Sequence, residues 1–456
     1  MTALRRPGLV PLLIAETIST TGSAMTALAL PWLVLVSTGS PGKASVVAAA
    51  EWVPMALLGI PSGPLAARLG PRRTMIACDL ARAPVVVAIP VLHWLGALPF
   101  GALIPLAALL GTFFPAHYAS QRTILPQLLG EQAGDVTRGN VLLQAANRLP
   151  LVVGPALAGA LVAAIGAPAV LLVDGVSYVV SVAILLLLVP ATGGAAAEEA
   201  DSGDVWAGAR ELTRDRLLGW LTGTFAVCEF AMQALFLALP ILAFTVYDQR
   251  PGLAGGLLAA WGAGALAGTV AALRLSDREP VRIVRLALVA QAAPLWLLPL
   301  DVPPVALGAA LLVSGLANPL ANAPSFTLIT LQVREPVRAK AILAFLTACT
   351  VAGGAGLFVT GPAAGALGAR EVLLAVAALM TAAALGFALA SRRGSGGGVL
   401  LTDRDRVIHR RDRQQAPDCR ARVRDHEAAS LRLGAVAGLE DCAQPRRVDE
   451  RELREL

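Results

Sequence analysis

Twelve apolar stretches, each close to the roughly 20 residues that an α-helix needs to cross a bilayer, constrain this chain more than any other feature. Only 15% of its 456 residues are charged and its mean hydropathy is +0.67, whereas a soluble protein is usually about 25% charged. The sequence therefore predicts an all-α integral membrane protein. The predicted spans are 9–36, 44–66, 74–95, 99–121, 141–164, 168–189, 217–246, 253–274, 281–300, 303–330, 341–366 and 370–390.

The basic residues between these spans predict the orientation of the chain. With the N-terminus inside, seventeen Lys and Arg of residues 1–390 fall on the inner side, while only Lys43, Arg250 and Arg370 fall outside. Lys and Arg concentrate on the cytoplasmic side of membrane proteins. We therefore expect a multi-pass protein of the cytoplasmic (inner) membrane with both termini in the cytoplasm.

The spans divide into two groups of six, which predicts two pseudo-symmetric six-helix bundles at residues 1–190 and 217–391. A polar segment, 191–216, has the composition of a cytoplasmic linker, and residues 392–456 form a charged tail that we expect to be disordered. An internal repeat follows the same division. Leu28-Ala-Leu-Pro31 matches Leu237-Ala-Leu-Pro240, and Gly154, Gly159 and Gly166 of the fifth span match Gly356, Gly361 and Gly368 of the eleventh. Repeats of this kind are common in transporters, whose substrate site lies between them.

The segment between the second and third spans carries the clearest motif, Gly63-Pro-Leu-Ala-Ala67-Arg68-Leu-Gly70-Pro-Arg72-Arg73, followed by Asp79 and Arg82. It resembles the loop 2–3 signature of the major facilitator superfamily, although Ala67 stands where the family carries an acid. Glycines permit a short turn, and arginines can bind a helix C-terminus or a neighbouring acid. We expect Gly63, Arg68, Gly70, Arg72, Arg73, Asp79 and Arg82 to form a gating motif.

Further resemblance points to the branch with bacterial drug and siderophore exporters. It rests on Ile18–Gly22, on Asp174-Gly-Val-Ser177 and on Gly154-Pro155 with Gly159, which is similar to the antiporter motif of the fifth span. The resemblance implies a secondary transporter in which two bundles rock about a central site.

Carboxylates inside apolar spans are the candidates for proton coupling, because a charge at mid-membrane is costly and usually faces a cavity or a partner. Glu229, Glu16 and Glu51 are these candidates, and each can instead be a structural hydrogen-bond acceptor. Gln233, Arg148, Asn147, Asn318 and Asn322 are candidates for the substrate cavity. Arg148 is equally suited to bind an anion or to pair with an acid such as Glu16.

The sequence excludes several other functions. It lacks the HExxH and GxSxG motifs of common hydrolases. The segment Gly39–Lys43 lacks the first glycine of a phosphate-binding loop, and Ala44 stands where such a loop has Ser or Thr. We expect no enzyme activity, no cofactor, no metal and no nucleic-acid partner. The predicted function is proton-coupled efflux of small hydrophobic or amphipathic compounds, such as a drug, antibiotic or siderophore, by a monomer in the lipid bilayer. An uptake permease for a metabolite and a non-transporting scaffold or sensor of the same fold are the alternatives.

Overall fold

The computed structural model describes residues 8–58, 68–130, 133–191, 207–275 and 279–394, and within these ranges the regular structure is helical. Eleven helical segments of the described residues are long and apolar enough to cross a membrane. The predicted second span, 44–66, begins in the helix Pro41–Leu58, and its remainder lies outside the described residues, as does the tail from 395 onwards. The helical membrane architecture predicted from the sequence is confirmed.

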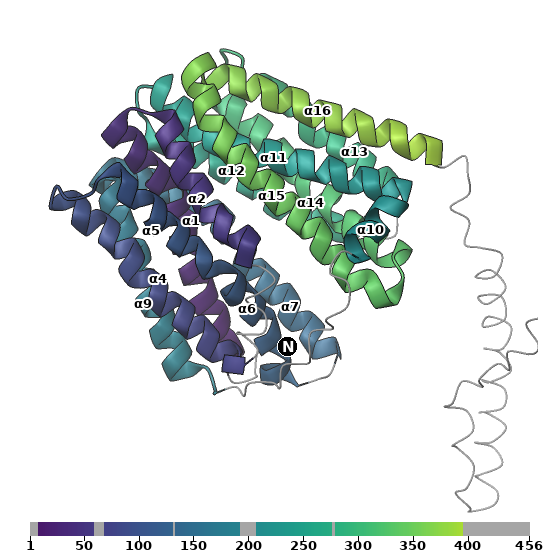
Figure 1. Cartoon of the computed structure of the whole chain (residues 1–456), viewed down its shortest axis with the longest axis horizontal. Coiled ribbons are helices and arrows are strands. Elements are labelled where there is room, and N and C mark those ends of the chain that lie inside the picture. Colours follow the sequence, from purple (N-terminus) through teal and green to yellow (C-terminus); the bar gives the residue numbers. More distant parts are fainter. Residues whose placement is uncertain (1–7, 59–67, 131–132, 192–206, 276–278, 395–456) are drawn as a thin grey trace, which may run out of the picture. The chain divides into compact units, whose positions relative to one another are not determined.

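The N-terminal bundle contains the first six predicted spans (Figure 1). Below, the side of the membrane on which α1 begins is called the N-face, and the other side the opposite face. The helices of this bundle are α1 (Leu9–Thr38), α2 (Pro41–Leu58), α4 (Pro71–Trp94), α5 (Phe100–Thr112), α6 (Phe114–Leu129), α7 (Ala133–Arg148), α8 (Pro150–Ile165) and α9 (Ala167–Leu188).

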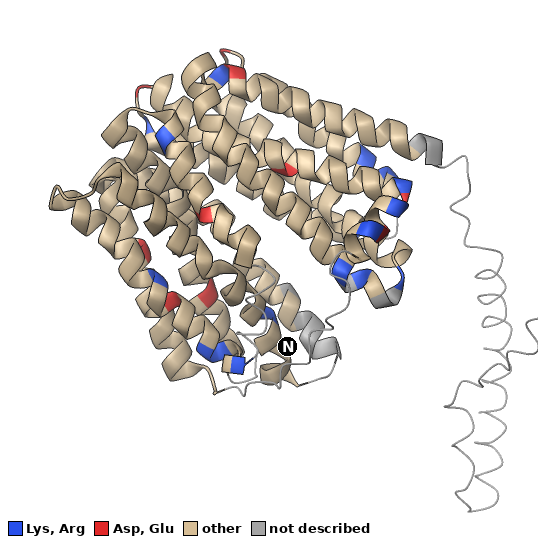
Figure 2. Cartoon of the chain, viewed as in Figure 1, with Lys and Arg blue, Asp and Glu red and all other residues tan. Residues whose placement is uncertain are grey.

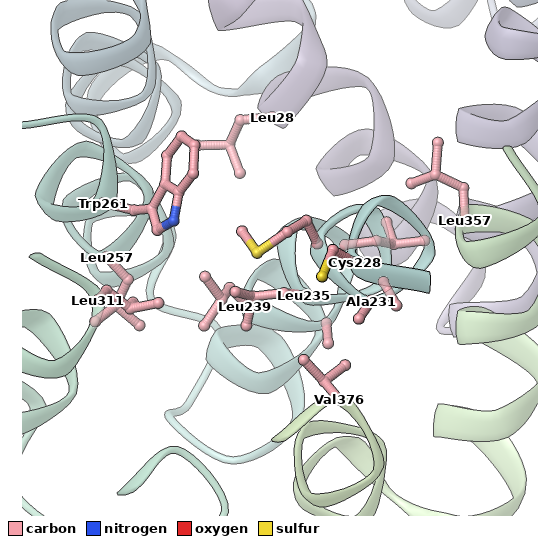
Figure 3. Close-up of a cluster of buried hydrophobic side chains, with 14 of the residues drawn as sticks. Leu28, Cys228, Ala231, Leu235, Leu239, Leu257, Trp261, Leu311, Leu357 and Val376 are labelled. Atoms are coloured by element: carbon pink, nitrogen blue, oxygen red, sulfur yellow. The ribbon is translucent and has the colours of Figure 1, made fainter. Parts of the chain in front are cut away.

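The C-terminal bundle repeats this arrangement after a short helix, α10 (Ala207–Arg214), which lies within the predicted linker. Helix α11 is its most buried element, and Leu235 and Leu239 on it are completely enclosed (Figure 3). The helices of this bundle are α11 (Arg216–Thr245), α12 (Pro251–Arg274), α13 (Pro280–Ala292), the 3₁₀ helix η2 (Ala293–Leu297), α14 (Pro304–Gln332), α15 (Glu335–Leu367) and α16 (Ala369–Gly394).

Three predicted spans are interrupted. The fourth divides at Phe113 into α5 and α6, the fifth divides at Leu149 into α7 and α8, and the ninth changes to 3₁₀ geometry at Ala293. A proline follows each break within two residues, and proline cannot donate the backbone hydrogen bond that a continuous helix requires. Helices α6 and α7, which adjoin two of these breaks, carry the buried polar side chains His117 and Gln121 and the half-buried Asn147.

The repeat seen in the sequence is reproduced in the packing. Gly154 of α8 faces Ala24 of α1, and its counterpart Gly356 of α15 faces Phe230 of α11. A Cβ built at either glycine would lie within 2.4 Å of the facing helix, so only glycine permits this approach. Gly166 and Gly368 both precede the last helix of their bundle with φ of +84° and +112°.

Contacts between the bundles are made on the opposite face. Gly159 of α8 packs on Gly255 of α12, and Gly361 of α15 packs on Pro41 and Ser45 of α2. The Ser45 hydroxyl also donates to the Leu357 carbonyl at 2.6 Å. All these residues lie in the half of their helices that approaches the opposite face, so the bundles are closed against each other there.

Charged residues collect at the helix ends, and a few acids lie midway along the spans (Figure 2). One polar contact fixes the linker helix α10 to the C-terminal bundle. Arg334 donates two hydrogen bonds of 3.1 Å to the Glu211 carboxylate, and these bonds hold the pKa of Glu211 below its usual range. Gly208 of α10 meets the backbone of Lys340 on α15, so this linker helix packs against the C-terminal bundle.

Candidate functional site

A cavity of about 250 Å³ lies between the two bundles. The repeated Leu-Ala-Leu-Pro segments contribute equivalent residues from each side, Leu28 and Pro31 from α1 and Leu237 and Pro240 from α11. Leu28 approaches Trp261 of α12 across the boundary between the bundles (Figure 3). The remaining lining residues are mostly apolar: Ala24, Ala27, Leu30, Ala48, Glu51, Trp52, Leu151, Pro155, Gln233, Phe236, Leu258 and Leu357.

Three polar side chains interrupt this apolar wall. Glu51 of α2 makes no hydrogen bond or ion pair within the described part of the chain. Trp261 is 8% exposed, and its Nε1 has no hydrogen-bond partner among the described residues. Gln233 donates from Nε2 to Glu229 Oε1 at 2.7 Å, which leaves its Oε1 as an acceptor. Glu51 and the Trp261 indole are therefore without a hydrogen-bond partner in the part of the chain that the structure describes.

A second polar site is enclosed within the N-terminal bundle, where His117 of α6 lies between two carboxylates. His117 Nε2 is 3.2 Å from Asp79 Oδ1 on α4 and 3.8 Å from Glu16 Oε1 on α1. Glu16 and Asp79 are completely buried, and His117 is 5% exposed. These three side chains come from three helices and meet in the interior of the bundle.

Neutral side chains complete this buried cluster. Gln121 donates to Glu16 Oε2, contacts His117 Nδ1 at 3.3 Å and accepts from Asn147 of α7 at 3.2 Å. Ser181 of α9 donates to Asp79 Oδ2 at 2.7 Å. The cluster therefore joins α1, α4, α6, α7 and α9 through these hydrogen bonds and the ion pair between His117 and Asp79.

Arg82 is the cation of the cluster. Its guanidinium lies 4.0 Å from Asp79 Oδ1 and over the ring of Tyr178 at 5.8 Å. Two carboxylates and one arginine leave one negative charge uncompensated when His117 is neutral. A net charge enclosed in low dielectric is costly, so the cluster is electrically balanced when it holds one additional proton.

Asp174 of α9 is a contrasting buried acid. Its Oδ2 accepts from Thr26 of α1 at 2.5 Å, and its Oδ1 accepts from Ser177 at 3.2 Å. Both oxygens are therefore satisfied by neutral donors, and this acid ties α1 to α9.

The predicted cavity residues fall in different places. Gln233 lines the cavity, whereas Asn147 belongs to the buried cluster. Asn322 of α14 donates to the Asn318 carbonyl at 3.0 Å, and neither asparagine lines the cavity. Arg148, at the end of α7, is half-buried and forms no ion pair with any described carboxylate. Glu229 sits one turn from Gln233 on the same face, next to Gly353 of α15.

The loop 2–3 motif surrounds the start of α4. Gly63 lies outside the described residues. Gly70 precedes α4 with φ of +83°, and Arg68 and Arg73 are exposed. Arg72 donates to the Leu185 carbonyl at 2.9 Å and the Leu186 carbonyl at 2.8 Å, at the C-terminal end of α9. This arginine therefore binds a helix C-terminus, where the dipole favours a cation.

The fifth-span motif lies at the boundary between the bundles. Gly154 contacts α1 of its own bundle, whereas Pro155 and Gly159 meet Gly255 of α12 in the other bundle. Pro155 also lines the cavity. The motif therefore connects the cavity wall to the contact that closes the opposite face.

Sequence reasoning missed His117, Gln121 and Trp261. A lone histidine in an apolar span is ordinarily a structural residue, yet His117 is the centre of the buried cluster. Its four-residue spacing from Gln121 placed two polar groups on one helix face, which was a usable signal. Trp261 carried no such signal, because an indole within an apolar helix is ordinarily a core residue.

Comparison with known proteins gives a consistent result. The family model described as Major Facilitator Superfamily matches residues 12–357. Multidrug efflux pump Tap of Mycobacterium tuberculosis (strain ATCC 25618 / H37Rv) is 26% identical over 377 residues, covering 80% of this chain and 89% of that protein. Multidrug efflux pump Tap of Mycolicibacterium fortuitum is 27% identical over 388 residues, covering 82% and 94%.

Solved structures with the same fold include the nucleoside transporter NupG, with a TM-score of 0.64, 14% identity and coverage of 84% of this chain and 98% of that one. A bacterial homologue of the human lysosomal transporter Spinster, inward-facing and unoccupied, has a TM-score of 0.65, 15% identity and coverage of 84% and 96%. At these identities the likeness concerns the fold.

Proposed function

Because the chain belongs to the major facilitator superfamily, we propose that it is a secondary transporter that exports small hydrophobic or amphipathic compounds in exchange for protons. The observation that carries this proposal is the apolar cavity between the two bundles, which takes its wall from both repeats. The relatives named multidrug efflux pumps support export as the direction and drugs or antibiotics as the substrate class.

Alternating access would proceed by separation of the glycine-rich contacts on the opposite face. That face is closed in this structure by the packing of Gly159 against Gly255 and of Gly361 against Ser45. A substrate would therefore enter the cavity from the N-face. The N-face carries most of the basic residues of the membrane-spanning part, which supports a cytoplasmic location for it. The same reasoning supports the inner membrane as the location and the cytoplasm as the place of both termini.

The division of the chain supports this mechanism. Residues 1–190 and 217–391 would act as the two moving bundles, with 191–216 as the cytoplasmic linker and 392–456 as a cytoplasmic tail. The cavity and the buried cluster are each complete within one chain, which supports a monomer as the transporting unit.

The buried cluster of Glu16, Asp79, Arg82 and His117 is suited to carry the proton, because one proton neutralises it. Glu16 Oε1 lies 3.8 Å from His117 Nε2, and Glu16 Oε2 accepts a hydrogen bond from Gln121. Glu229 is a second candidate, since it holds Gln233 of the cavity wall. Both candidates lie inside spans, where the membrane potential and proton gradient can act on them.

The test measures proton-gradient-dependent efflux of fluorescent hydrophobic dyes and antibiotics from cells that express the wild-type chain, Glu16→Gln or Glu229→Gln. We expect an uncoupler to abolish wild-type efflux, and Glu16→Gln to abolish it without an uncoupler. Asp174→Asn is the matched control, because it changes a buried acid whose hydrogen bonds come from neutral groups. Efflux in Glu16→Gln and Glu229→Gln that still follows the gradient would contradict the assignment of the proton.

The same cells separate the alternative functions. Gradient-dependent accumulation of a compound would identify an uptake permease. Normal membrane insertion without movement of any compound would identify a scaffold or sensor. Either result would overturn the export proposal.

A further inference from the structure

The central cavity contains a carboxylate that the buried proton cluster does not use. Glu51 lines the cavity from α2, within the N-terminal bundle, and forms no hydrogen bond or ion pair with the described residues. Arg82 interacts with it electrostatically, but within the described residues Arg82 forms its ion pair with Asp79. Among the described residues that line the cavity, Glu51 is the only carboxylate or other charged side chain. A carboxylate in an otherwise apolar wall favours a ligand that brings a positive charge.

The opposite wall, formed by the C-terminal bundle, supplies groups of different character. The Trp261 indole N–H is buried and has no partner within the described residues, which leaves a donor without an acceptor. Burying an N–H without an acceptor costs free energy, and a ligand oxygen would recover that cost. Gln233 is oriented by Glu229, so its Oε1 is left as a second acceptor for an N–H of the ligand.

Aromatic side chains determine what body such a ligand would have. The ring of Phe236 meets the ring of Trp261 edge-on, with centroids 4.8 Å apart, and Trp52 lines the cavity from α2 beside Glu51. Aromatic walls of this kind pack favourably against aryl groups in offset or edge-on geometry. The cavity therefore combines a negative group and an amide acceptor with a donor and aromatic surfaces.

We propose that Glu51 and Trp261 determine specificity in this cavity: Glu51 selects aryl compounds that carry a protonated amine, and Trp261 selects those that present a hydrogen-bond acceptor. The proposal rests on the proposed export through this cavity and adds a substrate class to it. In this proposal Glu51 binds the substrate, and the buried cluster carries the proton that is exchanged for it. Because Glu51 belongs to one bundle and Trp261 to the other, the ligand bridges the two.

The experiment measures binding to the purified full-length chain in lipid nanodiscs without any gradient. The probes are dansylcadaverine, whose primary amine is protonated, and its N-acetyl derivative, which has the same fluorophore and sulfonyl oxygens but no charge. We expect the wild-type chain to bind the amine about tenfold more tightly, as a charge-assisted hydrogen bond would give. Glu51→Gln should reduce this preference to less than about twofold through weaker binding of the amine alone.

Trp261→Phe should weaken the binding of both probes by a similar factor, because both probes present sulfonyl oxygens to the indole N–H. Trp220→Phe is the matched control, because Trp220 lies on the exposed side of α11 away from the cavity, and it should bind both probes as the wild type does. Equal or undetectable binding of the two probes by the wild-type chain would overturn the proposal, as would equal losses for both in Glu51→Gln. Because binding is measured without transport, failure of export leaves this result intact, and loss of the preference leaves export intact.

Discussion

At the residue scale, the charge balance of the buried cluster depends on Arg82. It is 5% exposed, and its guanidinium is the permanent positive charge beside Asp79 and Glu16. Arg82→Gln would leave two carboxylates without that cation. Removing one partner of a buried ion pair typically costs about 3–5 kcal/mol. We expect a marked fall in the thermal unfolding temperature of the detergent-solubilised protein. Size-exclusion chromatography after heating measures it as loss of the monodisperse elution peak.

A second substitution separates charge balance from lost packing. Asp79→Asn in the Arg82→Gln background removes the excess carboxylate, so we expect the double variant to regain part of the lost stability. Asp79→Asn alone also breaks this ion pair, but it leaves one carboxylate and one arginine, so it should lose less stability than Arg82→Gln. Energies of contacting residues that share one network are not additive. Equal instability of Arg82→Gln and the double variant would show that packing of the guanidinium, not its charge, is what the bundle requires.

The charged members of this cluster were recognisable in the sequence, and their association was not. Glu16, Asp79 and Arg82 attract notice because each interrupts an apolar run. His117 lies on α6, and it meets Asp79 and Glu16 only where α6 packs against α4 and α1 in the folded bundle. The contact between charged side chains of three separate helices is a tertiary property. No spacing along the chain expresses it.

At the element scale, Gly361 and Gly365 of α15 offer a comparison between two glycines one turn apart. A Cβ at Gly361 would lie 2.3 Å from the Pro41 carbonyl oxygen and 2.9 Å from Gly42 of α2, whereas a Cβ at Gly365 would meet nothing within 4 Å. Gly361→Val should therefore prevent closure of the opposite face and abolish efflux in cells. Gly365→Val should leave efflux within about twofold of wild type, because surface substitutions have small effects.

Both variants require a measurement of membrane insertion, for which fluorescence of a C-terminal fusion is suitable. Loss of efflux in Gly361→Val at normal insertion would agree with a role in closure. Unchanged efflux in Gly361→Val would show that α2 and α15 need not approach this closely during transport.

The extent of the helices was predictable, but their interruptions were not. Apolar length alone located the spans, because the bilayer requires it. Proline was an ambiguous signal: Pro31 and Pro240 remain inside continuous helices, while Pro115 and Pro150 follow breaks. Neighbouring helices decide which freed carbonyls can be satisfied, so local sequence does not decide between a kink and a break.

At the scale of the whole molecule, the two repeats explain why the cavity and the closing contacts lie together. In both α8 and α15, one glycine (Gly154 or Gly356) contacts the first helix of its own bundle. The glycine five residues later (Gly159 or Gly361) contacts a helix of the other bundle. Movement of one bundle therefore shifts both the contacts that close the opposite face and the wall of the cavity. The repeat was visible in the sequence as matched glycines, and the structure shows which surfaces those glycines serve.

The orientation of this assembly in the membrane gives the last prediction. The loop between α11 and α12 lies on the opposite face, and the loop between α14 and α15 lies on the N-face. Since basic residues are retained in the cytoplasm, the N-face should be cytoplasmic. Alkaline phosphatase, which needs disulfides formed outside the cytoplasm, should be active when fused after residue 249 and inactive when fused after residue 333. Green fluorescent protein at the same two positions should give the reverse pattern. Active phosphatase after residue 333 would invert the orientation, and with it the face from which a substrate enters the cavity.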